Sequence, residues 1–452
     1  MVTKMQVDII SREVIKPSSP TIHHYKPFKF PLFSQLTPTT YSPVIFFYPT
    51  TKPNLNITQT LIHLKKTLAE TLTLYYPFSG RVVDNLSIDH FDEGVPFFIA
   101  RVTGLVLSDF LKNPEIELLN GFLPYKPFTK ETDKGVPQMA FQVNVFSCGG
   151  IVIGWSSSHK LVDGPTGAAF IHAWATMSRT GSLSDVIKPN CDEASIFFPP
   201  RNPFPEEHLS LMESLWFTKG NYISKRFVFD SKAIASLRVK ARGEGNEKKN
   251  MPSRVEALSC FIWKCCMAAS RAASGTPKPS ILVEAVNLRT RTKPPMSKVS
   301  IGDIFWWATA VADPSLHNKE LHELATLLDE AIALYDSDYM ESLQGEDGFE
   351  TMSEYCNQLR GLFSIEEPDI FAFTSWSRLG IYDMDFGFGN PFWIGILGKV
   401  GPAFRNLTVF LETRDGKGIE AWITLDEERM ALLERDPEFL ANASPNPRFS
   451  SL

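Results

Sequence analysis

The sequence predicts an α/β protein made of two halves of similar size. Stretches with apolar residues three and four positions apart, the period of a helix, alternate with short stretches in which every second residue is apolar, the period of a strand. The 452 residues are 43% hydrophobic and include 34 Phe, which is enough apolar material for a large core. A proline-rich stretch near the middle, 197–205, separates the two halves. We therefore expect two α/β lobes with mixed sheets.

The first half contains a helix, a hairpin and a second helix. Helical periodicity predicts a helix over 58–75. Alternating apolar residues predict two strands, 141–145 and 151–155, joined by a turn that contains two glycines. The second strand continues into a polar stretch that starts at Ser156, and helical spacing returns over 166–178. The order strand, polar loop, helix is therefore expected around residue 160.

The crossover between the halves is expected where four prolines fall within 197–205, because proline lacks the N–H that a helix interior or a central strand needs. We expect an N-terminal lobe over 1–196, a crossover linker over 197–222 and a C-terminal lobe over 223–452. In the second half the same patterns predict helices at 231–241, 253–273 and 319–336, and strands at 224–229, 281–288, 392–397, 406–413 and 418–424.

Charge and cysteine content exclude several classes of function. The net charge of −6 leaves no positive field to collect a polyanion, so nucleic-acid binding is not expected. The six cysteines form no C-x-x-C pair, which is typical of a reduced intracellular protein without a zinc site. The first residues are polar where a signal peptide is apolar, and no run reaches the ~18 apolar residues of a membrane span. We expect a cytoplasmic monomer with no metal and no membrane partner.

The strongest candidate for chemistry is the segment that starts at His159 and ends with Asp163 and Gly164. His159 stands where a buried strand gives way to a loop that opens a helix, a place where α/β enzymes often carry reactive groups. Imidazole is the side chain best able to accept a proton near neutral pH, so His159 is a candidate general base. A loop histidine with satisfied hydrogen bonds fits this segment equally well.

Two other kinds of site are not supported. The stretch 154–158, Gly-Trp-Ser-Ser-Ser, lacks the second glycine of the G-x-S-x-G turn that carries the nucleophile of a serine hydrolase. His317 and His322 do not have the H-E-x-x-H spacing of a zinc protease.

A second motif lies some 220 residues later, at Asp385-Phe386-Gly387-Phe388-Gly389. Glycines on both sides of an aromatic residue permit a tight turn while the large rings pack inward. Asp385 is placed to accept hydrogen bonds from local N–H groups. The residues alone therefore indicate a structural turn near a buried surface.

Taken together, the two motifs resemble those of the plant BAHD acyltransferases, which join acyl-CoA donors to alcohols or amines. The family's H-x-x-x-D-G corresponds to residues 159–164, and its D-F-G-W-G is similar to residues 385–389. Similar stretches at 75–81 and 286–291 extend the resemblance over nearly the whole chain. It is closest to the vinorine synthase-like branch of alkaloid and alcohol acetyltransferases.

The resemblance implies a fold and a set of roles. The fold would be two chloramphenicol-acetyltransferase-like lobes with a channel between them, open to CoA on one side and to the acceptor on the other. His159 would be the general base, and Asp163 would give structural support by pairing with Arg289. Thr374 and Trp376 would line the acceptor side, with Thr374 a candidate donor to the oxyanion.

The same resemblance places Ser253 and Arg254 near the CoA phosphates, at a helix start that favours anions. The turn at residues 385–389 would be architectural. Two residues depart from the family pattern: Phe388 replaces its usual Trp, and Asp303 replaces the Asn of a common Gly-Asn pair. Phe388 lacks the indole N–H of Trp, and Asp303 adds a negative charge near a site that should accept anionic CoA, so both departures bear on the affinity for the donor.

The predicted function is acyl-CoA-dependent O-acyl transfer, with acetyl-CoA as the donor and a hydrophobic plant alkaloid or alcohol as the acceptor. Acyl-CoA is expected as a co-substrate, with no bound cofactor and no acyl-enzyme. Two alternatives remain: a longer or branched donor or an amine acceptor on the same fold, and a non-catalytic protein that binds a metabolite. Loops 28–45, 295–310 and 363–380 are expected to shape the acceptor pocket, together with five aromatic residues, Phe28, Phe30, Phe363, Phe371 and Phe373.

Overall fold

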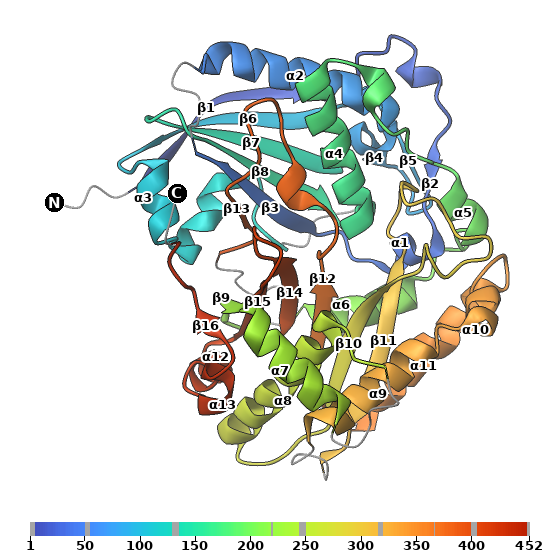
Figure 1. The fold of residues 1–452 in the computed structure, drawn as a ribbon. Coiled ribbons are helices and arrows are strands. Elements are labelled where there is room, and N and C mark those ends of the chain that lie inside the picture. The colour runs from blue at the N-terminus through green and yellow to red at the C-terminus, as the bar shows by residue number, and fades with distance from the viewer. Residues whose placement is uncertain are drawn as a thin grey trace.

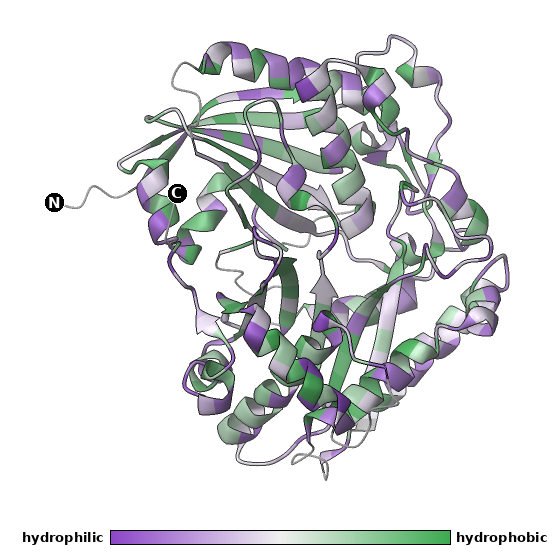
Figure 2. Cartoon of the chain, in the orientation of Figure 1, coloured by the Kyte–Doolittle hydropathy of each residue, from purple (hydrophilic) through white to green (hydrophobic). Residues whose placement is uncertain are grey.

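The computed structural model describes residues 5–49, 55–128, 135–217, 220–243, 250–314, 320–365, 367–398 and 405–449. These residues form two lobes, each built on a mixed sheet with helices packed against it (Figure 1). The strands of both sheets are largely hydrophobic, and polar residues concentrate on the helices and connecting segments (Figure 2). The predicted α/β class with two mixed sheets is therefore confirmed.

The N-terminal sheet has six strands in the order β1-β6-β7-β8-β3-β13, and only the pair β6 and β7 is parallel. Alternate side chains of β3 enter two different cores, which explains why this strand is buried along its whole length. One core lies under the helices α2 and α4, and the other is shared with the second lobe. The bounds are β1 Gln6–Ile15, β3 Tyr41–Tyr48, β6 Val95–Thr103, β7 Met139–Phe146, β8 Ile151–Ser158, β13 Trp393–Gly395, α2 Ile57–Leu74, α3 Leu107–Lys112 and α4 Gly164–Thr180.

The C-terminal sheet has seven strands in the order β11-β10-β12-β14-β15-β9-β16. The central pairs β10 with β12 and β12 with β14 are parallel, and the others are antiparallel. The bounds are β9 Tyr222–Phe229, β10 Ser280–Asn287, β11 Phe305–Ala312, β12 Asp369–Ser375, β14 Leu407–Glu412, β15 Ile419–Asp426, β16 Ser444–Pro445, α7 Ser231–Arg242, α8 Arg254–Ser274, α9 Leu321–Ala333, α10 Ser337–Ser342, α11 Gly348–Ile365, α12 Glu427–Leu433 and α13 Pro437–Leu440.

Short helices and a small sheet connect the two lobes and complete the N-terminal lobe. A small sheet is formed by β2 Phe28–Lys29, β5 Ser87–Asp89 and β4 Arg81–Val82. The helices α1 Leu32–Leu36, α5 Glu193–Phe197 and α6 Glu206–Trp216 lie near the junction of the lobes (Figure 1). The helix α6 falls inside 197–222, which the sequence suggested was a linker, and it begins after the last of the clustered prolines.

The segment that contains β13 departs from the order expected from the sequence. The predicted strand 392–397 exists as β13, but it pairs antiparallel with β3 at the edge of the N-terminal sheet, with Trp393 opposite Phe47. A part of the second half of the chain therefore belongs to the first lobe. The expected C-terminal lobe over 223–452 is interrupted by this segment. The periodicity of a strand gives no information about which sheet it joins.

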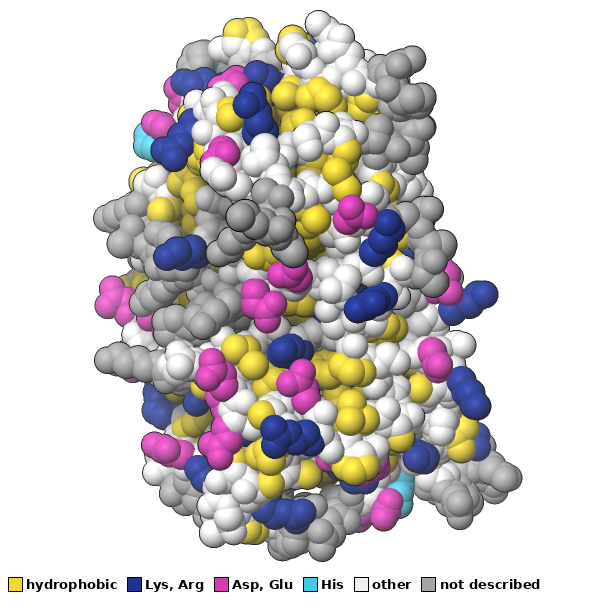
Figure 3. All heavy atoms as spheres, turned by 90° about the vertical axis from the view of Figure 1, so that its left-hand side faces the viewer, with side chains coloured by type: hydrophobic (Ala, Val, Ile, Leu, Met, Phe, Trp, Pro, Cys, Tyr) yellow, Lys and Arg dark blue, Asp and Glu magenta, His cyan; other side chains and the backbone are white. Residues whose placement is uncertain are grey.

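No helix within the described ranges is both long enough and apolar enough to cross a membrane. On the face of the molecule drawn in Figure 3, Lys and Arg side chains are interspersed with Asp and Glu, without a large area of one sign.

The strand β8, which leads to His159, requires a glycine at position 154. A Cβ atom built on Gly154 would lie 2.0 Å from the carbonyl oxygen of Phe122. We expect Gly154→Ala to lower the free energy of unfolding by about 1–3 kcal/mol, because the backbone itself must move. Urea denaturation measures this loss. The matched control is Gly361→Ala in α11, where no atom lies within 4 Å, and which should stabilise the helix by about 0.5–1 kcal/mol. Equal effects of both substitutions would contradict the packing argument.

Candidate active site

A cavity of about 280 Å³ lies between the lobes, and His159 is in its wall. Both sheets contribute to it: the chain around α1 and the start of β3 faces residues from β10, β11 and β12. Most of the lining is apolar, and the largest side chains are Phe128, Met212, Trp216, Phe217, Phe305, Trp306, Trp307 and Trp376. A second cavity of about 50 Å³ also has His159 in its wall. The imidazole therefore borders two spaces.

His159 is the first residue after β8, and three contacts fix it. Its backbone N–H donates to the carbonyl oxygen of Thr40 at 3.0 Å. Its ring meets the ring of Phe305 edge-on, with 5.6 Å between centroids. Its Nδ1 lies 3.4 Å from Oδ2 of Asp303. The side chain is 30% exposed, so the ring is held on one side and accessible on the other.

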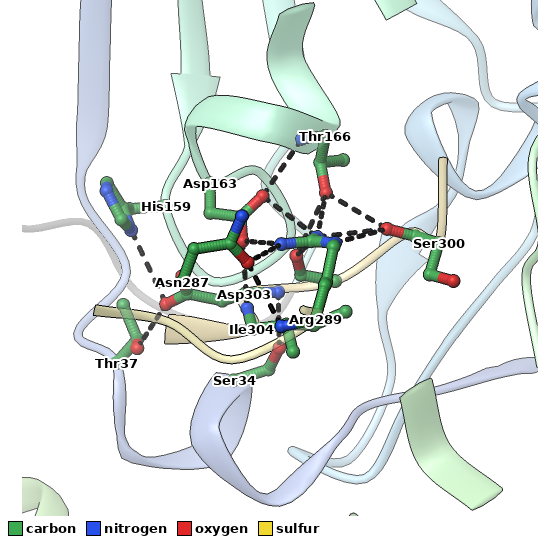
Figure 4. A network of polar contacts seen from close by, with 11 residues as sticks. Ser34, Thr37, His159, Asp163, Thr166, Asn287, Arg289, Ser300, Asp303 and Ile304 are labelled. Carbon is green, nitrogen blue, oxygen red and sulfur yellow. Dashed lines mark hydrogen bonds and ion pairs between the residues drawn. The ribbon is translucent and has the colours of Figure 1, made fainter. Parts of the chain in front are cut away.

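Asp163 and Arg289 form a buried ion pair beside this histidine (Figure 4). The two guanidinium nitrogens donate to the two carboxylate oxygens at 2.6 and 3.1 Å. Asp163 also caps α4, because its Oδ1 accepts from the N–H of Thr166 at 2.9 Å. Its Oδ2 accepts from the N–H of Ile304 at 3.0 Å. One carboxylate thus fixes both the helix after His159 and a segment of the other lobe.

Arg289 completes the attachment of that segment, residues 300–304. Its guanidinium donates to the carbonyl oxygens of Ser300 at 2.9 Å and Gly302 at 3.0 Å, and to Oγ1 of Thr166 at 2.8 Å. An isolated bridge between Val162 and Gly302 joins the same two stretches of backbone. The ion pair therefore positions Asp303, the residue that faces His159.

Asp303 is buried against His159. Its side chain is only 1% exposed, and the carboxylate lies beside the imidazole. Oδ2 accepts from Oγ1 of Thr37 at 2.5 Å, and its backbone N–H donates to Oγ of Ser34 at 3.2 Å. The effect of this charge on the binding of CoA stays a prediction.

Burial and the charges around the site shift the pKa values of His159 and Asp163. Burial alone would lower the pKa of His159, but the nearby carboxylate of Asp303 raises it, with a smaller contribution from Asp163. Burial opposes ionisation of Asp163, yet Arg289 and the N–H groups of Ile304 and Thr166 hold its pKa below the usual value. Asp163 is therefore an ionised structural group, and His159 is the group beside the cavity that can exchange a proton.

Residues 5–440 of the chain match a family model described as the Transferase family. The chain belongs to this family. The family is the BAHD group that the two motifs resemble, and its members are acyl-CoA-dependent acyltransferases. The position of His159 in the walls of two cavities is consistent with that activity.

Other proteins are similar to this BAHD transferase over almost the whole length of its chain. Akuammiline synthase 2 from Alstonia scholaris is 38% identical over 448 residues, which is 98% of each chain. Limonoid 7-O-acetyltransferase from Citrus sinensis is 38% identical over 460 residues, covering 98% of this chain and 99% of its own. A crystal structure of vinorine synthase superposes with a TM-score of 0.81 at 33% identity, covering 98% of this chain and 100% of that one. The two-lobe fold is therefore that of vinorine synthase.

The other candidate residues of this BAHD transferase fall into two groups. Thr374 and Trp376, at the end of β12, line the same cavity as His159. Ser253 caps α8 by accepting from the N–H of Glu256 at 3.1 Å, and Arg254 pairs with Glu412. Neither Ser253 nor Arg254 lines the two described cavities around His159, so their contact with CoA stays a prediction.

The turn at 385–389 packs against the N-terminal lobe. Asp385 accepts from the N–H groups of Gly387 and Gly389 at 2.8 Å each, and both glycines have positive φ. Phe386 meets the ring of Trp174 at 4.7 Å, and Phe388 meets the ring of Tyr48 at 4.9 Å. These contacts support an architectural role, in which Phe388 fills the place of the family's Trp.

Sequence reasoning missed part of the cavity wall. The loops 28–45, 295–310 and 363–380 do contribute lining residues, but the five phenylalanines named for them do not border this cavity in the described structure. Four of them, Phe28, Phe30, Phe371 and Phe373, are buried in the lobe cores. The walls instead include Met212 and Trp216 of α6, whose apolar spacing within 206–216 was the available signal. Within the described chain no cluster of His, Cys, Asp and Glu could hold a metal ion.

The Asp163–Arg289 pair should be necessary for stability as well as activity of the transferase. We expect Asp163→Ala to cost about 3–5 kcal/mol of unfolding free energy, because it leaves a buried guanidinium without its counterion. The pKa of Asp163 is lowered in the folded state, so its contribution is present above about pH 4 and is lost as the pH falls through the lowered pKa. Chemical denaturation at pH 7 measures the loss.

The matched control is Asp109→Ala, which breaks the exposed pair of Asp109 with Lys112. Exposed pairs contribute about 0–1 kcal/mol, so this variant should unfold almost like the wild type. A loss for Asp163→Ala no larger than that of the control would contradict the assigned role of the buried pair.

Proposed function

We propose that the protein transfers an acetyl group from acetyl-CoA to a hydroxyl of a hydrophobic plant specialised metabolite, an alkaloid or another alcohol. The observation that carries this proposal is the placement of His159 between the apolar cavity of about 280 Å³ and the smaller one of about 50 Å³. Donor and acceptor can meet at one imidazole, so both can be bound together and no acyl-enzyme is required.

His159 acts as the general base in this reaction. Its free ring nitrogen takes the proton of the acceptor hydroxyl as the oxygen attacks the thioester carbonyl carbon. The tetrahedral intermediate then collapses, the C–S bond breaks, and the imidazolium returns the proton to the thiolate of CoA. Thr374, in the same cavity wall, is placed to donate a hydrogen bond to the oxyanion.

The cavity walls support an uncharged or weakly polar acceptor. Aromatic and aliphatic side chains dominate, and no Lys or Arg among the described residues lines the cavity. A carboxylate on the acceptor would lose its hydration without gaining a cation there. Relatives of this chain include proteins named for alkaloid and limonoid acetylation, which agrees with a polycyclic, apolar alcohol. We infer also that the protein acts as a monomer, since one chain supplies both walls of the cavity. The absence of a C-x-x-C pair among the six cysteines favours a cytoplasmic location.

Replacing His159 should almost abolish turnover. We expect His159→Ala to lower kcat by about 10²–10⁴-fold, the usual contribution of a general base, with little change in folding. Release of CoA thiol, followed with a thiol-reactive dye in the presence of an acceptor, measures the rate.

His322→Ala is the matched control, because His322 lies on α9 away from both cavities. Acyl transfer that survives His159→Ala at the rate of this control would overturn the mechanism. Absence of acyl transfer by the wild-type protein with every donor and acceptor would favour the alternative of a non-catalytic metabolite-binding protein.

A panel of donors and acceptors tests the substrate class. We expect acetyl-CoA to be preferred over isovaleryl-CoA, and apolar polycyclic alcohols over acceptors that carry a carboxylate such as shikimate. Mass spectrometry of the products, with kcat/KM for each pair, gives the order. A preference for the branched donor would overturn the acetyl assignment, a preference for an amine acceptor would exclude O-acylation, and a preference for the acidic acceptor would overturn the interpretation of the apolar cavity.

A further inference from the structure

The geometry points to Asp303 as the positioning residue of His159, a buried carboxylate that orients the imidazole and stabilises the imidazolium formed during the reaction. This inference rests on the proposed function. It assigns a role to a residue at which the chain differs from the Asn of the family pattern. Figure 4 shows Nδ1 of His159 directed toward Asp303, while the other ring nitrogen points away from it.

The contacts of Asp303 direct its carboxylate toward His159. Oδ2 accepts a hydrogen bond from Thr37 at 2.5 Å and lies 3.4 Å from Nδ1 of His159. Oδ1 is buried and has no hydrogen-bond partner among the described residues. A buried carboxylate that lacks a full set of donors is costly. Its cost is offset when the neighbouring ring carries a positive charge.

A carboxylate also selects the tautomer of the histidine. An ionised carboxylate can only accept hydrogen bonds, so Nδ1 must carry the hydrogen, and Nε2 is left with its lone pair toward the substrates. An asparagine in this place could accept through its oxygen, but it would bring no charge. The carboxylate therefore strengthens the base in addition to orienting it.

Other charges near His159 do not cancel this effect. Asp163 acts in the same direction but is paired with Arg289, so the field of each is reduced by the other. Lys160 directs its Nζ to the carbonyl oxygen of Thr37 at 3.3 Å. Burial, with a smaller contribution from Asp163, raises the pKa of Asp303 above its usual value, although His159 and Thr37 oppose this shift. The balance leaves the pKa of His159 above its usual value.

The role in the reaction follows from the transfer of one proton. When the acceptor hydroxyl gives its proton to Nε2, the oxygen's electron pair forms the new C–O bond, and the ring becomes an imidazolium 3.4 Å from the carboxylate. When the C–S bond breaks, its electron pair goes to sulfur, and the same proton moves from Nε2 to the thiolate. Asp303 touches neither substrate, and it lowers the energy of the charged ring between these steps.

The test is Asp303→Asn, which keeps the size and the acceptor oxygen but removes the charge. We expect kcat at pH 8 to fall about 10- to 100-fold, with the KM for acetyl-CoA nearly unchanged. Without the carboxylate the pKa of His159 falls, so the acidic limb of the kcat/KM profile should move to lower pH. A kcat within twofold of wild type with an unmoved acidic limb would overturn the inference.

Ser34→Ala is the control variant. It removes the hydroxyl that accepts from the backbone N–H of Asp303, but it leaves the carboxylate in place. The acidic limb should then stay where it is in the wild type. If that limb shifts as much as in Asp303→Asn, the cause is the loosened backbone around Asp303 and not the loss of its charge, and the inference is overturned.

A second measurement is made on the wild-type protein and needs no identified acceptor. NMR titration of the histidine Cε1–H signals in the wild-type protein, with His159 assigned by its loss in His159→Gln, should give a pKa above about 6.5, the value of an unperturbed histidine. A value at or below that would overturn the inference. A raised value in a protein without acyl transfer would refute the proposed function while leaving the Asp303–His159 pairing intact.

Discussion

The ion pair between Asp163 and Arg289 is the interaction on which the site depends. It caps the helix that follows His159, and it holds the segment that carries Asp303 through the carbonyl oxygens of Ser300 and Gly302. Both members are buried, so their charges are screened by each other and not by water. The pair does not contact the imidazole of His159; it positions the helix and the segment that surround this histidine.

The histidine and the aspartate of the H-x-x-x-D-G motif thus occupy different environments, which their spacing in the sequence does not reveal. The histidine belongs to the cavity, and the aspartate four residues later belongs to the joint between the lobes. The carboxylate that touches His159 comes instead from position 303, on the other lobe. The proposed base comes from one lobe and the carboxylate beside it from the other, so their contact exists only when both lobes are assembled.

The sequence predicted the helices α2, α4, α7 and α8 well, because each has an apolar face at helical spacing. It missed β3, where Pro43 interrupts a run buried on both sides, and β1, an exposed edge strand with little contrast between its faces. His159 was a candidate from its position between a strand and a helix, whereas the pairing of Asp163 with Arg289 was found through the resemblance to a family. The place of Asp303 was not found, since it depends on how residues 300–304 fold back across the lobe boundary, which no local pattern records.

The strand β13 has a consequence for how the two lobes can move. It comes from the second half of the chain but is hydrogen-bonded into the first sheet, so the chain passes from one lobe to the other before β13 and returns after it. Any movement of one lobe against the other must bend each of these connections together. Relative motion of the lobes is therefore more constrained than in a protein whose two domains share a single connection.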